Sequence, residues 1–383
     1  MSNTICVIIE RSFYTTSWTL RVIAEMKNEA RRHQLKVEIM VCGMDELPKV
    51  QSFVASHSAD SLNPDIIPVI FVGSIVPWQK QVATIYFNDR RIRPIIASNN
   101  ISVPGIPISS ITLNRDLVMI DLVGHLYDSG ARKIALVGST FNSATDIKRY
   151  VGYVTGMRQH RIFNKDFIYT FKSGYLESME RFTRDAHQFD AVMFANDTAA
   201  IIFLSRAVSL GIRIPQDLMV TGFGNYLITS RLRMRLTTVN LNIEEIGRQA
   251  ILLCLILYRN PQILSLDIDI ECPIVYGSST LKRTAASQPA TSVPLPESPI
   301  YSRKDFQTID CLDKLCAKSS ELDLKIIKGL VHDISYRKLA ESLFISDSGF
   351  NYRLNKIFEF FQVKNKEELL EHCKWYQAIG LLD

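Results

Sequence analysis

Residues 190–200, Asp190-Ala-Val-Met-Phe-Ala-Asn-Asp-Thr-Ala-Ala200, indicate the fold class of the whole chain. Residues 191–195 form a continuous apolar run, which is typical of a parallel strand covered on both faces. Asn196 and Asp197 follow this run, and a helical pattern begins directly afterwards at Thr198. Because the carboxyl ends of parallel strands form the ligand-binding edge of α/β sheets, these two polar side chains are candidate ligand contacts.

The same unit of strand, loop and amphipathic helix recurs from residue 4 to about residue 275. This alternation predicts an α/β fold of doubly wound parallel sheets. We expect two lobes, one over about the first 110 residues and one over the next 120, with chain crossings near residues 106–113 and 236–242. The predicted strands are 5–9, 36–41, 66–72, 92–97, 133–137, 191–195 and 218–221, and the predicted helices are 19–33, 115–128, 146–160, 198–210 and 243–258.

Composition and charge limit the class of protein. A length of 383 residues with 47% hydrophobic residues predicts two or three folded domains. The net charge of +5 permits nucleic-acid binding but does not by itself indicate it. The first residues lack the pattern of a secretory signal, and the apolar runs are too short for a membrane span. We therefore expect a cytoplasmic protein without a membrane segment.

The sequence carries no signature of catalysis. Its seven cysteines are scattered, and no histidine lies beside them at zinc-ligand spacing, so we expect free thiols in a reducing compartment. Spacing reveals no glycine-rich phosphate loop and no nucleophile with its base. We therefore predict no catalytic residue, no metal site and no cofactor.

Several ordered motifs resemble the effector domain of LacI/GalR-type repressors, a fold that also occurs in periplasmic sugar-binding proteins. The resemblance spans residues 4–275 and implies a hinged, two-lobed sensor for a small polar ligand. It is specific for the fold and not for the ligand. The motifs are residues 190–200, 210–217, 220–223 and 236–239, with residues 130–138 and 149–153 upstream.

The resemblance suggests roles for two charged residues. Asp197 could accept hydrogen bonds from neighbouring ligand hydroxyls, or it could cap the helix that begins near Thr198. Arg149 corresponds to an arginine that reaches the ligand in these proteins, and its guanidinium group suits a polyol or a carboxylate. The alternative for Arg149 is an ordinary surface arginine on a helix.

Two loops supply further candidates for ligand binding. In the first strand–helix loop, Ser12 could donate a hydrogen bond, and the rings of Phe13, Tyr14 and Trp18 could stack on a sugar or simply pack. The family usually has an acidic residue after the Gly-Phe pair at residues 222–223, whereas here Gly-Asn follows. Asn225 is therefore a candidate substitute, and a different ligand or lost binding are the alternatives.

The character of the sequence changes after residue 276. The segment GSSTLKRTAASQPATSVPLPESP at residues 277–299 is rich in Ser, Thr, Ala and Pro and predicts a linker. We expect a sensor over residues 1–276, a linker over 277–302 and a helical domain over 303–383. LacI/GalR repressors carry their DNA-binding domain before the effector domain, but here the first strand begins at residue 4, so we expect the output domain at the other end.

The helical tail has the pattern of a helix-turn-helix. Residues 322–330 and 335–343 are amphipathic, and Ser335 is a suitable N-cap for the second helix. Ser346 and the three residues after it begin a third helix that continues to residue 361, and residues 366–379 predict a fourth. Apolar residues at spacings of three and four predict a single core. These are Leu339, Ala340, Leu343, Ile345, Phe350, Leu354 and Ile357.

The order of these helices resembles the LuxR-type DNA-binding domain. Leu339-Ala-Glu-Ser-Leu-Phe-Ile-Ser346 matches the segment before its recognition helix, although Gly349 and Asn351 replace the usual Thr and Lys. The resemblance implies double-stranded DNA as a partner and a homodimer, with base or phosphate contacts from one helix. A tail that binds a protein partner is the alternative. The residues implied in DNA binding are Ser346, Ser348, Asn351, Tyr352, Arg353 and Lys356.

Overall fold

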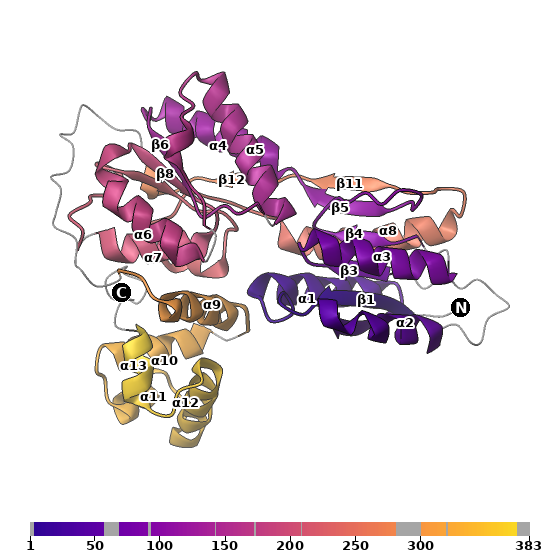
Figure 1. Ribbon diagram of the computed structural model, residues 1–383. Coiled ribbons are helices and arrows are strands. Elements are labelled where there is room, and N and C mark those ends of the chain that lie inside the picture. The colour runs from indigo at the N-terminus through magenta and orange to yellow at the C-terminus, as the bar shows by residue number, and fades with distance from the viewer. Residues whose placement is uncertain are drawn as a thin grey trace. The chain divides into compact units, whose positions relative to one another are not determined.

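The computed structural model describes residues 4–56, 69–90, 93–141, 143–171, 174–207, 209–280, 300–318 and 321–373 (Figure 1). Most of the predicted linker and the last residues of the predicted fourth helix lie outside these ranges. The chain forms two compact units. Unit 1 comprises Met1–Leu117, Phe141–Val151 and Leu241–Pro273, and unit 2 comprises Val118–Thr140, Gly152–Asn240 and Ile274–Asp383.

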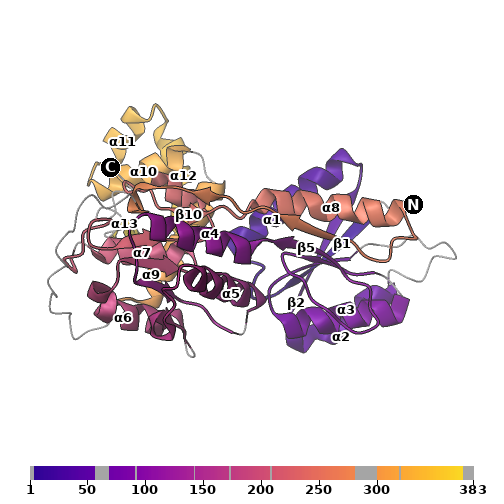
Figure 2. The ribbon, with the colours of Figure 1, turned by 90° about the horizontal axis from the view of Figure 1, so that it is seen from above.

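Unit 1 contains a parallel six-stranded sheet with the order β11-β5-β4-β3-β1-β2. Helices α1 (Ser17–Arg32) and α8 (Ile243–Arg259) cover one face, and α2 (Leu47–Ser56) and α3 (Val76–Arg90) cover the other (Figure 2). The apolar runs of β1, β3 and β4 are buried, as two covered faces require, whereas the predicted strand at residues 36–41 lies at the edge of the sheet and is only partly buried. The strands are β1 (Thr4–Glu10), β2 (Lys36–Cys42), β3 (Val69–Val72), β4 (Ile95–Ala97), β5 (Ser109–Leu113) and β11 (Asp267–Ile270), with the short helix η1 (Met44–Glu46) after β2.

The predicted crossing at residues 106–113 is wrong, because β5 occupies most of it and belongs to the sheet of unit 1. The sequence pattern did not predict this strand because it contains polar residues, whose side chains bond to β11. Ser110 Oγ donates to Asp267 Oδ1 at 2.6 Å, and the Thr112 hydroxyl donates to Asp269. This polar ladder allows two adjacent strands to form without apolar periodicity.

Unit 2 contains a parallel four-stranded sheet with the order β7-β6-β8-β9 and a small antiparallel pair of β10 and β12. Figure 1 shows α6 and α7 on the side of this sheet that faces α9. The predicted α/β fold with a helical C-terminal region is confirmed. The elements are β6 (Ile134–Val137), β7 (Ile168–Tyr169), β8 (Ala191–Phe194), β9 (Met219–Thr221), β10 (Thr238–Val239), β12 (Ile274–Val275), α4 (Arg115–Asp128), α5 (Ala144–Gln159), α6 (Tyr175–Asp185), α7 (Asp197–Ala207), and the short helices η2 (Lys165–Phe167), η3 (Ala186–Gln188), η4 (Leu227–Arg231) and η5 (Ser278–Thr280).

The beginning of the predicted linker packs on unit 2. Ser279 is buried, and its hydroxyl donates to the carbonyl of Val220 at 2.7 Å. The Thr280 hydroxyl lies 2.6 Å from that of Thr237. Ser279 and Thr280, which fall within the predicted linker, therefore pack as part of unit 2.

The helical tail shares a continuous apolar core with the rest of unit 2. Its first helix, α9 (Arg303–Lys318), packs on α7 and η4, and Tyr301 just before it is buried, with its hydroxyl 2.8 Å from that of Thr183. The remaining helices are α10 (Glu321–Val331), α11 (Tyr336–Ser342), α12 (Asp347–Phe361) and α13 (Lys366–Cys373). Five residues of the predicted tail core are buried, and the remaining two, Leu343 and Ile345, are partly buried. The buried ones are Leu339, Ala340, Phe350, Leu354 and Ile357.

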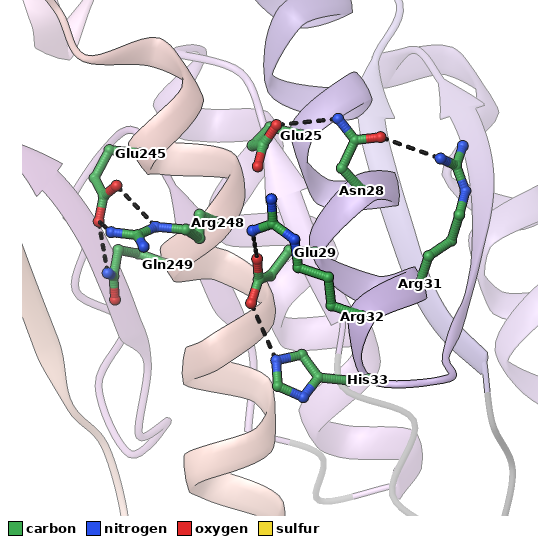
Figure 3. A network of polar contacts seen from close by, with 9 residues as sticks. All are labelled: Glu25, Asn28, Glu29, Arg31, Arg32, His33, Glu245, Arg248 and Gln249. Atoms are coloured by element: carbon green, nitrogen blue, oxygen red, sulfur yellow. Dashed lines mark hydrogen bonds and ion pairs between the residues drawn. The ribbon is translucent and has the colours of Figure 1, made fainter.

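Helices α1 and α8 of unit 1 pack closely, and each carries polar contacts between its own side chains (Figure 3). Glu29 accepts from Arg32 at 2.7 Å, and Glu245 accepts from Arg248 at 2.7 Å. Close approach requires Gly247, since a Cβ atom there would lie 2.5 Å from the carbonyl oxygen of Val22. Such a contact is too short, and the opposing atom is backbone, so the helices would have to separate.

We expect Gly247→Ala to lower the free energy of unfolding by about 1–3 kcal/mol, because overpacking displaces α1 from α8. Urea unfolding followed by circular dichroism measures this change. Gly124→Ala is the matched control, since a Cβ there meets only His160 Nε2 at 3.6 Å. In the control, alanine should leave stability unchanged or raise it by up to about 1 kcal/mol. Equal behaviour of the two variants would contradict the close packing.

Candidate functional site

The carboxyl end of β8 positions Asn196 and Asp197 in different roles. Asn196 Oδ1 accepts from the backbone N–H of Ala199 at 2.9 Å and so caps α7. Asp197 is fully buried, and its Oδ1 accepts from the Thr238 hydroxyl at 2.5 Å. Its Oδ2 accepts from the backbone N–H of Tyr226 at 2.8 Å. The interpretation of Asp197 as the helix cap is therefore wrong, because Asn196 performs that role.

Two glycines after β9 allow the chain to pass over the Asp197 carboxylate. A Cβ at Gly222 would lie 2.2 Å from Asp197 Oδ1, and one at Gly224 would lie 3.5 Å from Oδ2. Asn225 follows with a φ of 47°, and its backbone N–H donates to Thr238 Oγ1 at 3.2 Å. The sheet edge thus brings together Asn196, Asp197 and Asn225, three of the residues predicted to bind ligand.

The environment of Asp197 favours its neutral form. Burial raises the pKa of Asp197 from 3.8 to about 7, hydrogen bonds from Thr238 and Tyr226 oppose the rise, and the negative charge of Asp313 adds to it. The buried carboxyl group therefore changes charge near neutral pH.

We expect the wild-type protein to lose stability between about pH 4 and pH 7, because the folded state holds a proton on Asp197 that the unfolded chain releases. The contribution is fully present below about pH 4 and lost as the pH rises through about 7. In Asp197→Asn this part of the pH dependence, at most about 1.4 kcal/mol per pH unit, should vanish. Urea unfolding at several pH values tests this, and parallel profiles for the two proteins would refute it.

The chain segment beside Asp197 also contacts the tail. We call residues 222–231, which run from the end of β9 through η4, the 222–231 loop. The backbone N–H of Ile228 in this loop donates to Asp313 Oδ1 of α9 at 3.2 Å. Asp313 is 1% exposed. One short loop therefore hydrogen-bonds to Asp197 at its beginning and to the first tail helix near its end, a connection that the sequence did not reveal.

The remaining predicted ligand contacts belong to unit 1. Ser12 is exposed, and its backbone N–H donates to Glu10 Oε2 at 2.9 Å while its hydroxyl also donates to that carboxylate. Phe13 is half-buried near Gly73 at the end of β3, and Tyr14 is exposed. Ser12 and Phe13 therefore lie at the carboxyl edge of the first sheet, as predicted, although the Ser12 hydroxyl already has a partner.

Arg149 of α5 is mostly buried and pairs with Asp146 one turn earlier. The interpretation of Arg149 as an ordinary surface residue is therefore wrong. Sequence reasoning missed Arg115, which begins α4 and is 4% exposed. The available signal was its position, because a cation at the start of a helix opposes the helix dipole and so requires a reason.

The helices predicted for the tail are present as α10, α11, α12 and α13. Ser346 Oγ accepts from the backbone N–H of Gly349 at 3.2 Å and caps α12, whereas Ser335 occupies the N-cap position of α11 without a side-chain bond. The turn between the helices places Phe344 at a φ of 55°, and its ring is 96% exposed. Ile345 N–H donates to the Ala340 carbonyl at 3.1 Å, which completes a Schellman motif.

Most of the residues predicted to bind DNA face solvent. Ser346, Ser348 and Asn351 are exposed, Tyr352 is 60% exposed, and the ammonium group of Lys356 lies 4.6 Å from the Tyr352 ring. Arg353 differs from this group. Its Nη1 donates to Asp323 Oδ1 of α10 at 2.8 Å, and its side chain is 34% exposed. Arg353 therefore joins two tail helices and is not a freely available base contact.

Membrane spans and metal sites are absent from the described ranges. No helix there combines the length and apolar character that crossing a bilayer requires. No group of three or more His, Cys, Asp or Glu side chains in these ranges could hold a metal ion.

Comparisons with known proteins agree with this architecture. Residues 123–280 match the family described as periplasmic binding protein-like domain. The chain is 25% identical over 217 residues to the HTH-type transcriptional repressor CytR of Escherichia coli K12, covering 55% of this chain and 62% of CytR. It is 29% identical over 149 residues to catabolite control protein A of Priestia megaterium, covering 37% of this chain and 45% of that protein. The chain thus matches less than two thirds of the length of these relatives.

Solved structures show the same fold. The transcriptional regulator CelR in complex with cellobiose superposes with a TM-score of 0.62 at 14% identity, covering 72% of this chain and 84% of CelR. A LacI family regulator from Enterococcus faecium with bound ribose gives a TM-score of 0.60 at 14% identity, covering 73% of this chain and 100% of that one. The predicted periplasmic-binding-protein-like domain, similar to that of LacI-type regulators, is therefore confirmed.

Proposed function

We propose that this chain is a cytoplasmic, ligand-responsive transcription regulator that binds double-stranded DNA through α10–α13. The observation that carries the proposal is the two-sided character of α12. Phe350, Leu354 and Ile357 bury one side, while Asn351 and Lys356 remain exposed on the other. An exposed polar side on the second helix of a helix-turn-helix suits insertion into the major groove. The similarity of the sensor region to repressors such as CytR supports the same reading.

The contacts that α12 offers fall into two classes. Asn351 can pair with an adenine edge, and Lys356 can bind phosphate as a point charge. The exposed N-terminus of α12, capped by Ser346, offers backbone N–H groups to a second phosphate. Arg337 of α11 is 87% exposed and can also reach phosphate. A homodimer would place two such helices on neighbouring half-sites, and light scattering of the full chain measures that state.

The ligand is proposed to be small and polar, by analogy with the cellobiose and ribose in the similar structures. In unit 2, Asn225 and Asn196 at the sheet edge are the proposed polar contacts, and Asp197 fixes the loop that carries Asn225. For unit 1 taken by itself, the proposed contacts are Ser12, Phe13, Tyr14 and Arg149. A ligand that shifts the 222–231 loop would also shift α9, because Asp313 accepts the Ile228 N–H. This loop is the proposed path from ligand to output.

Selection of bound fragments from random double-stranded DNA, followed by footprinting with the full-length protein, tests the proposal. We expect a defined sequence to be protected, with affinity falling as salt rises because phosphate contacts release counterions. If the protein protected DNA without sequence preference, even at low salt, sequence-specific DNA binding would be excluded.

One observation favours a tail that binds a protein instead. The fully exposed ring of Phe344 lies in a left-handed conformation, where glycine is usual. Ile334 and Tyr336 nearby are also partly exposed. Phe344→Gly should relieve strain and stabilise the tail by about 1 kcal/mol. If this variant keeps DNA binding but loses regulation in cells, a protein partner at this ring is supported.

A further inference from the structure

Arg115 of unit 1 has an unfavourable environment for a cation. Its side chain is almost fully buried, and its Nε atom has no hydrogen-bond partner among the described residues. Its Nη1 donates to the carbonyl oxygen of Ser98 at 3.1 Å. A buried guanidinium group without a carboxylate partner carries a large desolvation penalty, so such groups are normally paired.

Two further features add to this penalty. Arg115 is the first residue of α4, where the helix dipole is positive and repels a cation. Arg149 is close enough that its charge, together with burial, lowers the pKa of Arg115 to about 10. Asp146 is the acidic residue that acts on Arg115, but it already pairs with Arg149. Arg115 therefore keeps an excess positive charge that no carboxylate among the described residues pairs with directly.

We propose that Arg115 and Arg149 form a binding site for an anionic group, carboxylate or phosphate, of the small ligand. A bound anion would accept from Arg115 Nε, neutralise the excess charge and interact favourably with the start of α4. The guanidinium fork matches the planar geometry of both groups. The inference rests on the proposed sensor function and makes it more specific, because it favours an acidic or phosphorylated ligand over a neutral sugar.

The nearby polar groups are consistent with a prepared site. Ser98, which accepts from Arg115, has a φ of 85° and donates through its hydroxyl to the Gly73 carbonyl at 3.3 Å. Gln79 Nε2 donates to the same carbonyl at 2.8 Å, and Asn99 donates to Gln79 Oε1 at 3.1 Å. These bonds fix the Ser98 carbonyl and therefore one end of the Arg115 side chain.

The test uses the full-length protein and measures melting temperature while sodium phosphate replaces sodium chloride at constant ionic strength. We expect the wild type to be stabilised more than Arg115→Gln, because an anion that binds the folded state stabilises it. Arg248→Gln is the matched control, since Arg248 is an exposed arginine of unit 1, and it should respond like the wild type. An equal response of wild type and Arg115→Gln, or no response of the wild type, would overturn the proposal.

Calorimetric titration with D-glucuronate, D-glucose 6-phosphate and D-glucose distinguishes the sources of the anion. We expect one of the two anionic probes to bind, and Arg115→Gln to weaken that binding at least about tenfold. Binding of glucose alone, with equal affinity in both proteins, would overturn the proposal. Failure of DNA binding by the wild type is a separate result, which would remove the proposed function without changing the anion measurements.

If Arg115 only stabilised the fold, Arg115→Met should lower the melting temperature of the ligand-free protein. If Arg115 serves the ligand, Arg115→Met should maintain or raise the melting temperature without ligand, because it removes an uncompensated buried charge. It should also abolish the response to phosphate. A lower melting temperature with an unchanged phosphate response would assign Arg115 to the fold and overturn the proposal.

Discussion

Asn351→Ala is expected to weaken operator binding by the full-length protein about 5- to 150-fold, because a bidentate contact to a base contributes about 1–3 kcal/mol. Asn351 is exposed on α12, one position after the buried Phe350 that anchors the helix. Its loss removes a contact without disturbing the core. The effect should be confined to one base-pair position of the operator, where specificity should relax.

Lys356→Ala should act differently from Asn351→Ala. A phosphate contact contributes equally to all sequences, so this variant should weaken specific and non-specific binding alike and reduce the salt slope by about 1. Electrophoretic mobility shifts at several salt concentrations measure both quantities. Lys325→Ala is the matched control, since Lys325 is an exposed lysine of α10, outside the reading helix. Unchanged binding by both α12 variants would favour a tail that binds protein.

Arg353 shows why the proposed DNA-binding surface could be predicted only in part. Its helical position places it among exposed residues, and the sequence cannot reveal that Asp323, 30 residues earlier, accepts its guanidinium group. Such a pairing depends on the packing of α12 against α10. We therefore expect Arg353→Ala to destabilise the tail and to affect DNA binding indirectly, unlike the change at Asn351.

The fold was largely predictable because its strongest signals are local. Continuous apolar runs identified β1, β6 and β8, and helical periodicity identified α4 with its observed bounds. The polar strand β5 was missed because its side-chain partners lie on β11, more than a hundred residues later. The formation of β5 therefore depends on its tertiary pairing with β11, which the local sequence pattern does not contain.

The candidate site followed the same division. The sequence placed Asn196 and Asp197 at a sheet edge because a strand end fixes that location, whereas Asn225 was named only from the family resemblance of residues 222–223. It could not assign the cap to Asn196 or the loop contact to Asp197, because both side chains suit both roles. Arg115 and Asp313 depend on burial and on partners distant in the sequence, which composition and spacing do not encode.

Asp313→Ala is expected to lower the free energy of unfolding by about 1–3 kcal/mol, because it leaves the buried N–H of Ile228 without this acceptor. It should also change operator affinity about 5- to 150-fold, since coupling between sites typically amounts to 1–3 kcal/mol. Urea unfolding and mobility shifts measure the two effects. Asp305→Ala, at the start of the same helix and paired with Arg206, is the control for a general weakening of α9.

A double-mutant cycle separates direct coupling from general destabilisation. Asp197 and Asp313 are both buried, and burial together with the negative charge of Asp313 raises the pKa of Asp197. Above about pH 7, where Asp197 is charged, Asp197→Asn and Asp313→Asn each remove the same repulsion between the two carboxylates. The double variant should therefore be less stable than the sum of the single effects by about 0.5–3 kcal/mol. The pair Asp197→Asn and Asp305→Asn should be additive within about 0.5 kcal/mol. Additivity in both pairs would mean that the 222–231 loop holds the tail in place but does not couple changes at Asp197 to the tail.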